Sequence, residues 1–254
     1  MTITFLGTGT SQGVPVIACN CEVCTSRDSK DKRLRSSILI NTNGKNLVID
    51  TGPDFRYQML REKVQHLEAI LYTHAHKDHI AGLDDVRAFN YSQGAPIDVF
   101  ADHLVQDALK REFYYIFTEH KYPGIPQINL HDVYDTPFYV GDLEIKPIDI
   151  MHYKLPIKGY RFNDFTYLTD VKSVSDVSME RIAGTKVLVV NALQREPHIS
   201  HFTLDEAITF AQKIGAEETY LTHISHKLGL HQEVSTMLPE NIYLAYDGLK
   251  LTLS

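Results

Sequence analysis

The chain has 254 residues, of which 43% are hydrophobic and 22% charged, as in ordinary globular proteins of one large domain or two small ones. A net charge of −7 argues against a protein that coats nucleic acid, since such proteins carry a basic face. No signal-peptide pattern and no run of the ~20 apolar residues that span a membrane is visible. Three cysteines, all between positions 19 and 24, form no disulfide framework, so we expect a cytoplasmic protein.

Strand and helix patterns alternate along the whole chain. Strands are predicted at residues 3–6, 37–40, 47–50, 69–73, 97–100, 144–148, 159–162, 166–169, 187–190, 219–222, 242–244 and 250–253. Helices are predicted at residues 54–63, 84–91, 103–113, 175–182, 204–214 and 231–237, the fifth beginning with a capping box of Thr203 and Glu206. Turn signals such as Asn43-Gly44 indicate hairpins as well as crossovers. The mixture predicts an α/β protein of mixed sheets covered by helices.

Residues 113–138 fit this pattern least well. The aromatic residues of 113–124 indicate core, a dimer contact or the wall of a substrate pocket. Residues 120–138 have little periodicity and contain three prolines. We expect a long excursion there, either a lid near the site or a surface loop.

The largest group of candidate metal ligands follows the apolar residues 69–72. His74, His76, Asp78 and His79 fall within six positions. At a strand end or tight turn the first two can share one side while the last two face a second point, which suits two adjacent metals better than one. Imidazole and carboxylate ligands suit Zn or Mn, and also Fe or Ni. A polar turn with exposed histidines is the plainer interpretation, but four ligand residues at this spacing disfavour it.

Further ligand residues each follow an apolar strand. His152, Asp170 and His223 occupy such positions, and Asp50 ends the strand at 47–50. Taken singly, each could be a cap or turn residue. Because four such residues occur, each at the end of an apolar strand, coincidence does not explain them well.

Residues 74–79 resemble the His-x-His-x-Asp-His signature of the metallo-β-lactamase superfamily, and residues 47–52 (LVIDTG) resemble its strand-Asp-x-Gly element. The resemblance implies an αββα sandwich, with two mixed sheets face to face and flanked by helices, in a single domain over residues 1–254. It implies that His74, His76 and His152 hold one metal, that Asp78, His79 and His223 hold a second, and that Asp170 bridges them. His76, in place of a glutamate, favours hydrolysis over redox chemistry. Asp50 would orient the loop that carries the ligands, although a turn former explains it equally well.

Cys19, Cys21 and Cys24 offer three thiolates, one fewer than a tetrahedral zinc site needs. His226 could supply the fourth ligand, and three buried free thiols are the alternative. This loop, residues 6–15 (LGTGTSQGVP), residues 221–226 (LTHISH) and residues 246–248 resemble the PhnP cyclic phosphodiesterase family over nearly the whole chain. The resemblance implies a structural zinc at Cys19, Cys21, Cys24 and His226, in a loop inserted at about residues 17–30. It also implies a catalytic histidine that is not a ligand, for which His201 is preferred to His198; a solvated loop histidine is the alternative.

The expected function is hydrolysis of a small phosphodiester, presumed cyclic, by attack of a metal-bound hydroxide, with Asp78 and Asp170 at the metals and His201 as general acid. Rival functions are hydrolysis of a thioester, lactone or other carbonyl substrate, transfer-RNA 3′-end processing, and metal-dependent binding without catalysis. No clamp insertion or basic stripe supports a nucleic-acid partner. The substrate-binding residues are not predicted, no membrane partner is expected, and a homodimer is compatible with the resemblance.

Overall fold

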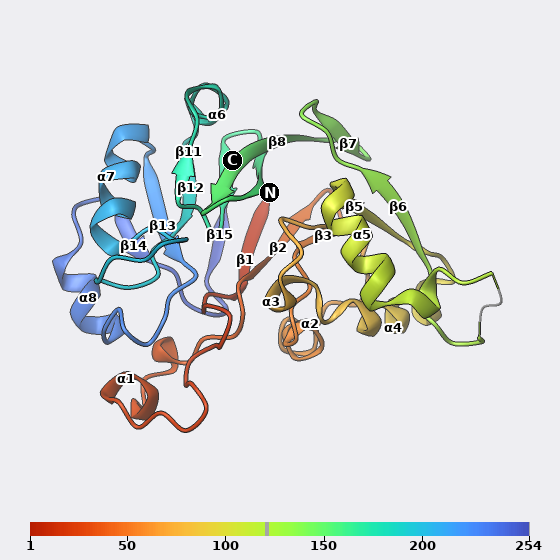
Figure 1. The fold of residues 1–254 in the computed structure, drawn as a ribbon, viewed down its shortest axis with the longest axis horizontal. Coiled ribbons are helices and arrows are strands. Elements are labelled where there is room, and N and C mark those ends of the chain that lie inside the picture. The colour runs from red at the N-terminus through yellow and green to blue at the C-terminus, as the bar shows by residue number, and fades with distance from the viewer. Residues whose placement is uncertain (120–121, 254) are drawn as a thin grey trace. The chain divides into compact units, whose positions relative to one another are not determined.

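The computed structural model describes residues 1–119 and 122–253. The chain forms two compact units, the first comprising Met1–Gly7, Ser37–Tyr134 and Gly248–Ser254, and the second Thr8–Ser36 and Asp135–Asp247. Each unit has one mixed β-sheet with its own helices (Figure 1). The predicted α/β class, with two mixed sheets flanked by helices, is confirmed, and the single domain over residues 1–254 stays a prediction.

The described part of the first unit has a seven-stranded sheet in the order β15-β1-β2-β3-β4-β5-β6. Its strands are β1 (Thr2–Gly7), β2 (Ser37–Thr42), β3 (Lys45–Ile49), β4 (Ala69–Leu71), β5 (Ile97–Ala101), β6 (Ile128–Asp132) and β15 (Lys250–Thr252). Strands from β15 to β3 pair antiparallel, and those from β3 to β6 pair parallel. Because parallel strands end at the same edge of a sheet, the residues that follow β3 and β4 meet there.

Helices pack on this sheet through one apolar core. They are α2 (Phe55–Glu62), α3 (Lys77–Ile80), α4 (Arg87–Gln93) and α5 (His103–Glu112), with 3-10 turns at Leu83–Val86 and Tyr114–Ile116. The core joins Phe55, Phe89 and Leu109 from the helices to Ile70 and Val99 from the strands. Phe113 and Ile116 are buried in the same core, so the start of the aromatic segment serves packing.

The second unit has an eight-stranded sheet among its described residues, ordered β11-β8-β9-β10-β12-β13-β14, with β7 also paired to β8. Its strands are β7 (Phe138–Val140), β8 (Leu143–His152), β9 (Leu155–Phe162), β10 (Phe165–Leu168), β11 (Ser173–Val174), β12 (Val187–Asn191), β13 (Glu218–Thr222) and β14 (Ile242–Leu244). Its helices are α1 (Glu22–Thr25), α6 (Asp176–Ile182), α7 (Leu204–Ile214) and α8 (His231–Met237), with a 3-10 turn at Ser29–Asp31. Strands β10, β12, β13 and β14 run parallel, so their ends also share one edge.

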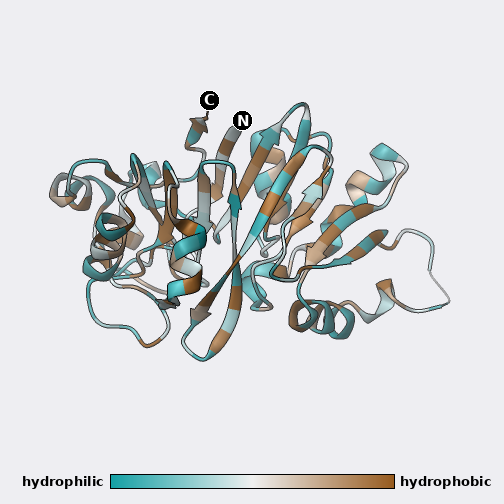
Figure 2. Cartoon of the chain, turned by 90° about the horizontal axis from the view of Figure 1, so that it is seen from above, coloured by the Kyte–Doolittle hydropathy of each residue, from teal (hydrophilic) through white to brown (hydrophobic). Residues whose placement is uncertain are grey.

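The hydropathy pattern explains why most elements form where the sequence predicts them. Hydrophobic residues concentrate along the strands, while the connections are largely hydrophilic (Figure 2). The α7 helix begins with the predicted capping box: Thr203 Oγ1 accepts from the Glu206 amide at 3.2 Å, and the Thr203 amide donates to the Glu206 carboxylate at 2.8 Å. Among the described residues, no helix is long and apolar enough to cross a membrane.

The expectation of an irregular excursion over residues 120–138 is wrong for Ile128–Asp132. These residues form β6, which pairs parallel with β5. Strand β6 is a sheet edge with only partly buried apolar side chains, so its hydrophobic pattern is weak. Residues 120 and 121, which the expected excursion and aromatic segment include, lie outside the described residues.

Candidate metal centre

Asp50 lies directly after β3 and is fully buried. Its carboxylate accepts hydrogen bonds from the Thr73 amide and hydroxyl, both at 2.8 Å, and lies 2.7 Å from His79 Nδ1. Burial raises the pKa of Asp50, against the opposing effect of His79 and Thr73. This geometry orients the His79 ring, which fits the positioning role expected of Asp50.

The other ligand residues of the first unit lie in the turn between β4 and α3. His74 Nε2 is 3.1 Å from His76 Nδ1, and the His74 and His79 ring centroids are 4.1 Å apart. Asp78 Oδ2 is 3.2 Å from His79 Nε2. Lys77 instead forms an ion pair with Glu112 of α5. The turn therefore groups His74, His76, Asp78 and His79, as predicted from their spacing.

In the second unit, His152 ends β8, Asp170 follows β10 and His223 follows β13. Asp170 Oδ1 is 3.2 Å from His223 Nε2. His152 Nδ1 lies 2.9 Å from the carbonyl oxygen of Asp170 and 3.0 Å from that of Ser200. His152, Asp170 and His201 each offer a ligand atom within 4.8 Å of the others. These predicted residues are thus brought together within their unit.

The backbone has the same unusual conformation at three of these strand ends. Asp50, Asp170 and His223 have φ angles of 63°, 58° and 54°, in the left-handed region that non-glycine residues adopt uncommonly. Such strain persists where the surrounding structure determines it, and it concentrates at functional sites.

The His223 ring is held by two residues, Ser36 and Thr10, whose roles the sequence did not indicate. Ser36 Oγ donates to the Gly9 carbonyl oxygen at 2.9 Å, so its lone pair accepts from His223 Nδ1 at 3.2 Å. Thr10 Oγ1 lies 3.2 Å from His223 Nε2. Both lie in the Thr8–Ser36 stretch, far from His223 in sequence, so no local pattern could reveal them.

The ring hydrogen bonds fit metal binding. His79, His152 and His223 each engage Nδ1 with an oxygen acceptor: the Asp50 carboxylate, backbone carbonyls and the Ser36 hydroxyl, respectively. Nε2 is then the atom of each ring that would bind a metal, the arrangement usual for metal-ligating histidines.

His201 lies just before the α7 cap and is 8% exposed. Burial lowers its pKa to about 3, against the opposing effect of Asp170. Its Nδ1 is 3.7 Å from Asp170 Oδ1 and has no hydrogen-bond partner among the described residues. The His201 ring also stacks on that of His223, with centroids 4.9 Å apart. His198 is half-buried, and its ring centroid lies 5.1 Å from that of His201.

The cysteine loop forms a separate cluster. The sulfur atoms of Cys19, Cys21 and Cys24 lie 3.3, 3.3 and 3.5 Å from His226 Nδ1. A hydrogen bond from the Cys24 backbone lowers the pKa of Cys21 to about 6, whereas burial raises that of Cys24 to about 11. Three sulfurs and one imidazole nitrogen at this spacing fit a tetrahedral zinc site.

Comparison with known proteins decides the family. The beta-lactamase superfamily domain matches residues 45–224. A solved diphosphatase from the PhnP family is 43% identical, has a TM-score of 0.94, and is matched over 100% of this chain and 98% of its own. The chain belongs to the PhnP family of the metallo-β-lactamase superfamily.

Two further proteins are similar to this chain. An octanoyltransferase of Porphyromonas gingivalis is 42% identical over 98% of this chain, which covers 51% of that protein. Zinc-bound PqqB of Methylobacterium extorquens shares the fold, with a TM-score of 0.80 and 18% identity over the full length of both chains. The chain spans about half or less of the length of the curated relatives it matches.

Proposed function

We propose that this PhnP-family hydrolase cleaves a phosphorus–oxygen bond of a small phosphodiester-type substrate with two divalent metals. The proposed ligands are those that the sequence resemblance implies, namely His74, His76, Asp78, His79, His152, Asp170 and His223. The identity of 43% over the whole chain to a protein of the PhnP family that is named a diphosphatase carries the proposal. The ring hydrogen bonds at His79, His152 and His223 support it within each unit.

The protein side chains have distinct tasks in this mechanism. Bound divalent cations would polarise the phosphate oxygens and lower the pKa of the attacking water. Asp50 and Ser36 hold ligand rings in one tautomer. Because these hydrogen bonds hold the ligand rings before substrate binds, the rings would need little rearrangement during the reaction. Asp170 would be a carboxylate ligand that helps to hold both metals.

His201 is the proposed general acid that protonates the leaving oxygen. Its low pKa leaves the ring neutral at pH 7 before substrate binds. A substrate phosphate placed beside the ring would favour the charged form and raise this pKa, as opposite charges do. Proton donation of this kind contributes about 10²- to 10⁴-fold to the rate.

Two linkages fit this chemistry. The sequence resemblance favours a cyclic phosphodiester, and the name of the solved relative favours a diphosphate. In both, hydrolysis adds water across one phosphorus–oxygen bond and releases one oxygen as the leaving group. The use of Mn or Zn, a homodimer and a cytoplasmic location stay predictions.

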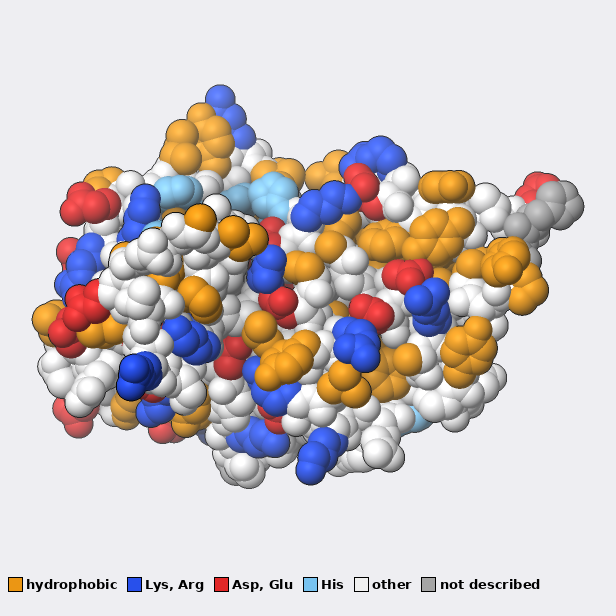
Figure 3. All heavy atoms as spheres, turned by 90° about the horizontal axis from the view of Figure 1, so that it is seen from below, with side chains coloured by type: hydrophobic (Ala, Val, Ile, Leu, Met, Phe, Trp, Pro, Cys, Tyr) orange, Lys and Arg blue, Asp and Glu red, His pale blue; other side chains and the backbone are white. Residues whose placement is uncertain are grey.

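A carbonyl substrate is the second candidate, because a relative that matches 98% of this chain, over 51% of its own length, is named an octanoyltransferase. Transfer-RNA processing has weaker support. On the face drawn in Figure 3, described Lys and Arg side chains are interspersed with Asp and Glu rather than gathered in a stripe.

A substrate panel tests the proposal. Metal-reconstituted protein is assayed with a five-membered cyclic phosphate, a linear aryl phosphodiester, a dinucleoside diphosphate, an octanoyl thioester and a lactone. We expect the highest kcat/KM for one of the phosphorus substrates. Preference for the thioester or lactone would overturn the proposal, whereas the order among the phosphorus substrates assigns the linkage.

A further inference from the structure

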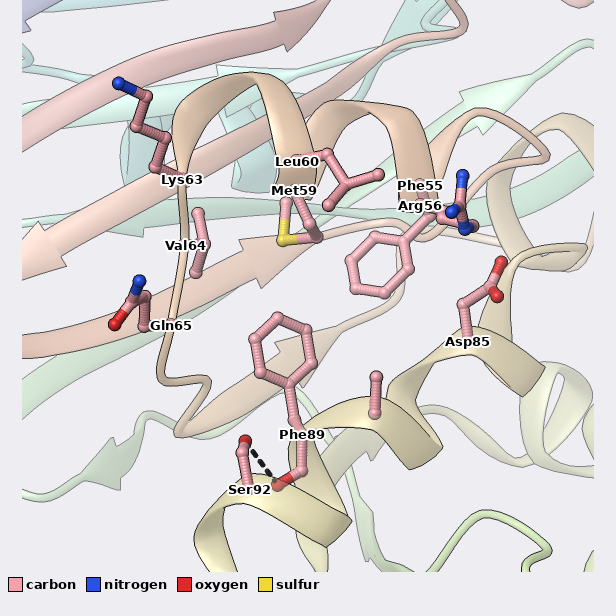
Figure 4. A pocket seen from close by; sticks show the side chains of 11 residues that line it. Phe55, Arg56, Met59, Leu60, Lys63, Val64, Gln65, Asp85, Phe89 and Ser92 are labelled. Atoms are coloured by element: carbon pink, nitrogen blue, oxygen red, sulfur yellow. Dashed lines mark hydrogen bonds between the residues drawn. The ribbon is translucent and has the colours of Figure 1, made fainter.

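A cavity of about 660 Å³ lies between α2 and α4 of the first unit (Figure 4). Phe55 and Phe89 face one another across its apolar floor, and none of the proposed metal ligands lines it. This cavity is therefore not part of the metal centre. A group that could recognise a substrate at the metals lies instead in the second unit, at His198.

The backbone of Ser200 determines which nitrogen of His198 carries the proton. The Ser200 amide donates to His198 Nδ1 at 3.4 Å, so this nitrogen offers a lone pair and the proton of the neutral ring is on Nε2. The carbonyl oxygen of Ser200 accepts from His152 Nδ1 at 3.0 Å. One residue therefore orients a proposed ligand ring and the His198 ring, and the His198 ring presents an N–H donor at Nε2.

The His198 ring lies beside the proposed general acid. Its centroid is 5.1 Å from that of His201, which in turn is 4.6 Å from the His152 centroid and 4.9 Å from the His223 centroid. His201 Nδ1 lies 3.7 Å from Asp170 Oδ1. A substrate whose leaving oxygen reaches His201 would therefore pass close to His198.

The charges close to His198 favour an anion. Burial lowers the pKa of His198, and the positive charges of His152, Lys172 and Lys227 lower it further. Lys172 forms an ion pair with Glu206 at 2.8 Å, which offsets its charge. Lys227 is exposed, and its ammonium has no hydrogen bond or ion pair among the described residues. An N–H donor near an unpaired cation suits anionic oxygens.

We propose that His198 and Lys227 bind a second phosphate group of the substrate, next to the phosphorus that is attacked at the metals. The His198 Nε2–H group donates to an oxygen of that phosphate, and the Lys227 ammonium balances its charge. A diphosphate has such a group, whereas a cyclic phosphodiester has a single phosphate. This inference rests on the proposed function and chooses between the two linkages that fit it.

The test compares two substrates of metal-loaded protein, diadenosine diphosphate and the five-membered cyclic phosphate of adenosine. Wild type should have the higher kcat/KM for the diphosphate. His198→Leu should lower this value about 10- to 100-fold, the effect of losing a hydrogen bond to a charged group, and should leave the value for the cyclic phosphate nearly unchanged. His198→Gln keeps a side-chain N–H donor and should recover most of the loss. His103→Leu, on the exposed surface of α5, is the control and should behave as wild type.

Binding is measured separately from turnover, by calorimetry with the inert methylene-bridged analogue of diadenosine diphosphate. Lys227→Gln should weaken this binding by up to about fivefold, the size of an exposed ion pair. Lys213→Gln, on the exposed surface of α7, should leave it unchanged.

Two results would overturn the inference and leave the proposed function standing. One is a kcat/KM of wild type for the cyclic phosphate that equals or exceeds that for the diphosphate. The other is an equal loss on both substrates in His198→Leu, which would show that His198 supports the structure of the site. Turnover of neither phosphorus substrate, with cleavage of a thioester or lactone instead, would overturn the inference and the proposed function together.

Discussion

At the scale of single residues, a hydrogen bond at Nδ1 leaves Nε2 as the histidine nitrogen that would bind a metal. A serine, a carboxylate and two backbone carbonyls perform this task for His223, His79 and His152. The sequence could indicate the rings themselves, because each follows an apolar strand. It could not indicate Ser36, since this partner is 187 positions away from His223.

Ser36→Ala should weaken metal binding by about 10- to 100-fold, because His223 loses the acceptor that fixes its tautomer. The measurement is competition with a chromophoric chelator. Ser36→Thr keeps the hydroxyl and should restore most of the affinity. Ser178 also donates to a backbone carbonyl, that of Asp149, so Ser178→Ala is the control. Equal metal affinity of Ser36→Ala and Ser178→Ala would contradict the role of Ser36.

His231 should make the stability of the fold depend on pH. Burial, together with the charges of Arg33 and Lys30, lowers its pKa to about 4, against the opposing effect of Asp28 and Asp31. The unfolded chain, with an ordinary histidine pKa of about 6.5, then binds more protons, so stability is full above pH 6.5 and falls as the pH drops towards 4.

This pH dependence is measured by urea unfolding of wild type and His231→Gln between pH 7.5 and 4.5. The wild-type free energy of unfolding should fall more steeply than that of the variant. Both proteins share the acid sensitivity of the cysteine cluster, which cancels in the difference. Parallel curves would show that His231 does not titrate in this range.

At the scale of elements, hydrophobic periodicity predicted the strands that carry the site. Strands β3, β4, β10 and β13 are mostly buried, and β8 alternates buried with more exposed residues, so their hydrophobic patterns are strong. Strands β6, β7 and β11 were missed, because Val140 is their one buried residue and they therefore show little hydrophobic pattern. Helix α3 was missed because a four-residue helix shows no periodicity.

The cysteine loop is an element whose order depends on few contacts. Its apolar cluster contains only Val14, Val23 and Cys24 as buried members. Without a metal, so small a core contributes little stability. The proposed zinc therefore contributes more to the stability of this loop than the packing of its side chains does.

Cys21→Ser should remove one zinc per chain and lower the Tm by a few degrees, since metal binding contributes to folding. Zinc is counted by elemental analysis of the purified protein. Ser26, which donates to Asp31 in the same loop, provides the control Ser26→Ala, which should keep its zinc. Full zinc content in Cys21→Ser would contradict a four-ligand site.

At the scale of the whole molecule, the family follows from the combination of motifs rather than from any one of them. The run from His74 to His79 is common to the superfamily and says little about substrate. The full-length likeness to a PhnP-family diphosphatase is the reason for proposing a phosphorus-containing substrate. The substrate itself is beyond the sequence, because no residue pattern in the chain is specific to one organic group.

The most direct test is turnover of the best phosphorus substrate before and after exhaustive chelation, with metal counted in the same samples. Wild type should hold two active-site metals besides the zinc, lose activity with them, and regain it on addition of Mn or Zn. Asp170→Ala should lower the turnover rate at least about 100-fold, because losing a metal ligand costs more than losing a residue that orients one. His201→Ala should lower it about 10²- to 10⁴-fold and keep its metals. Full activity after the metals are removed would contradict the account.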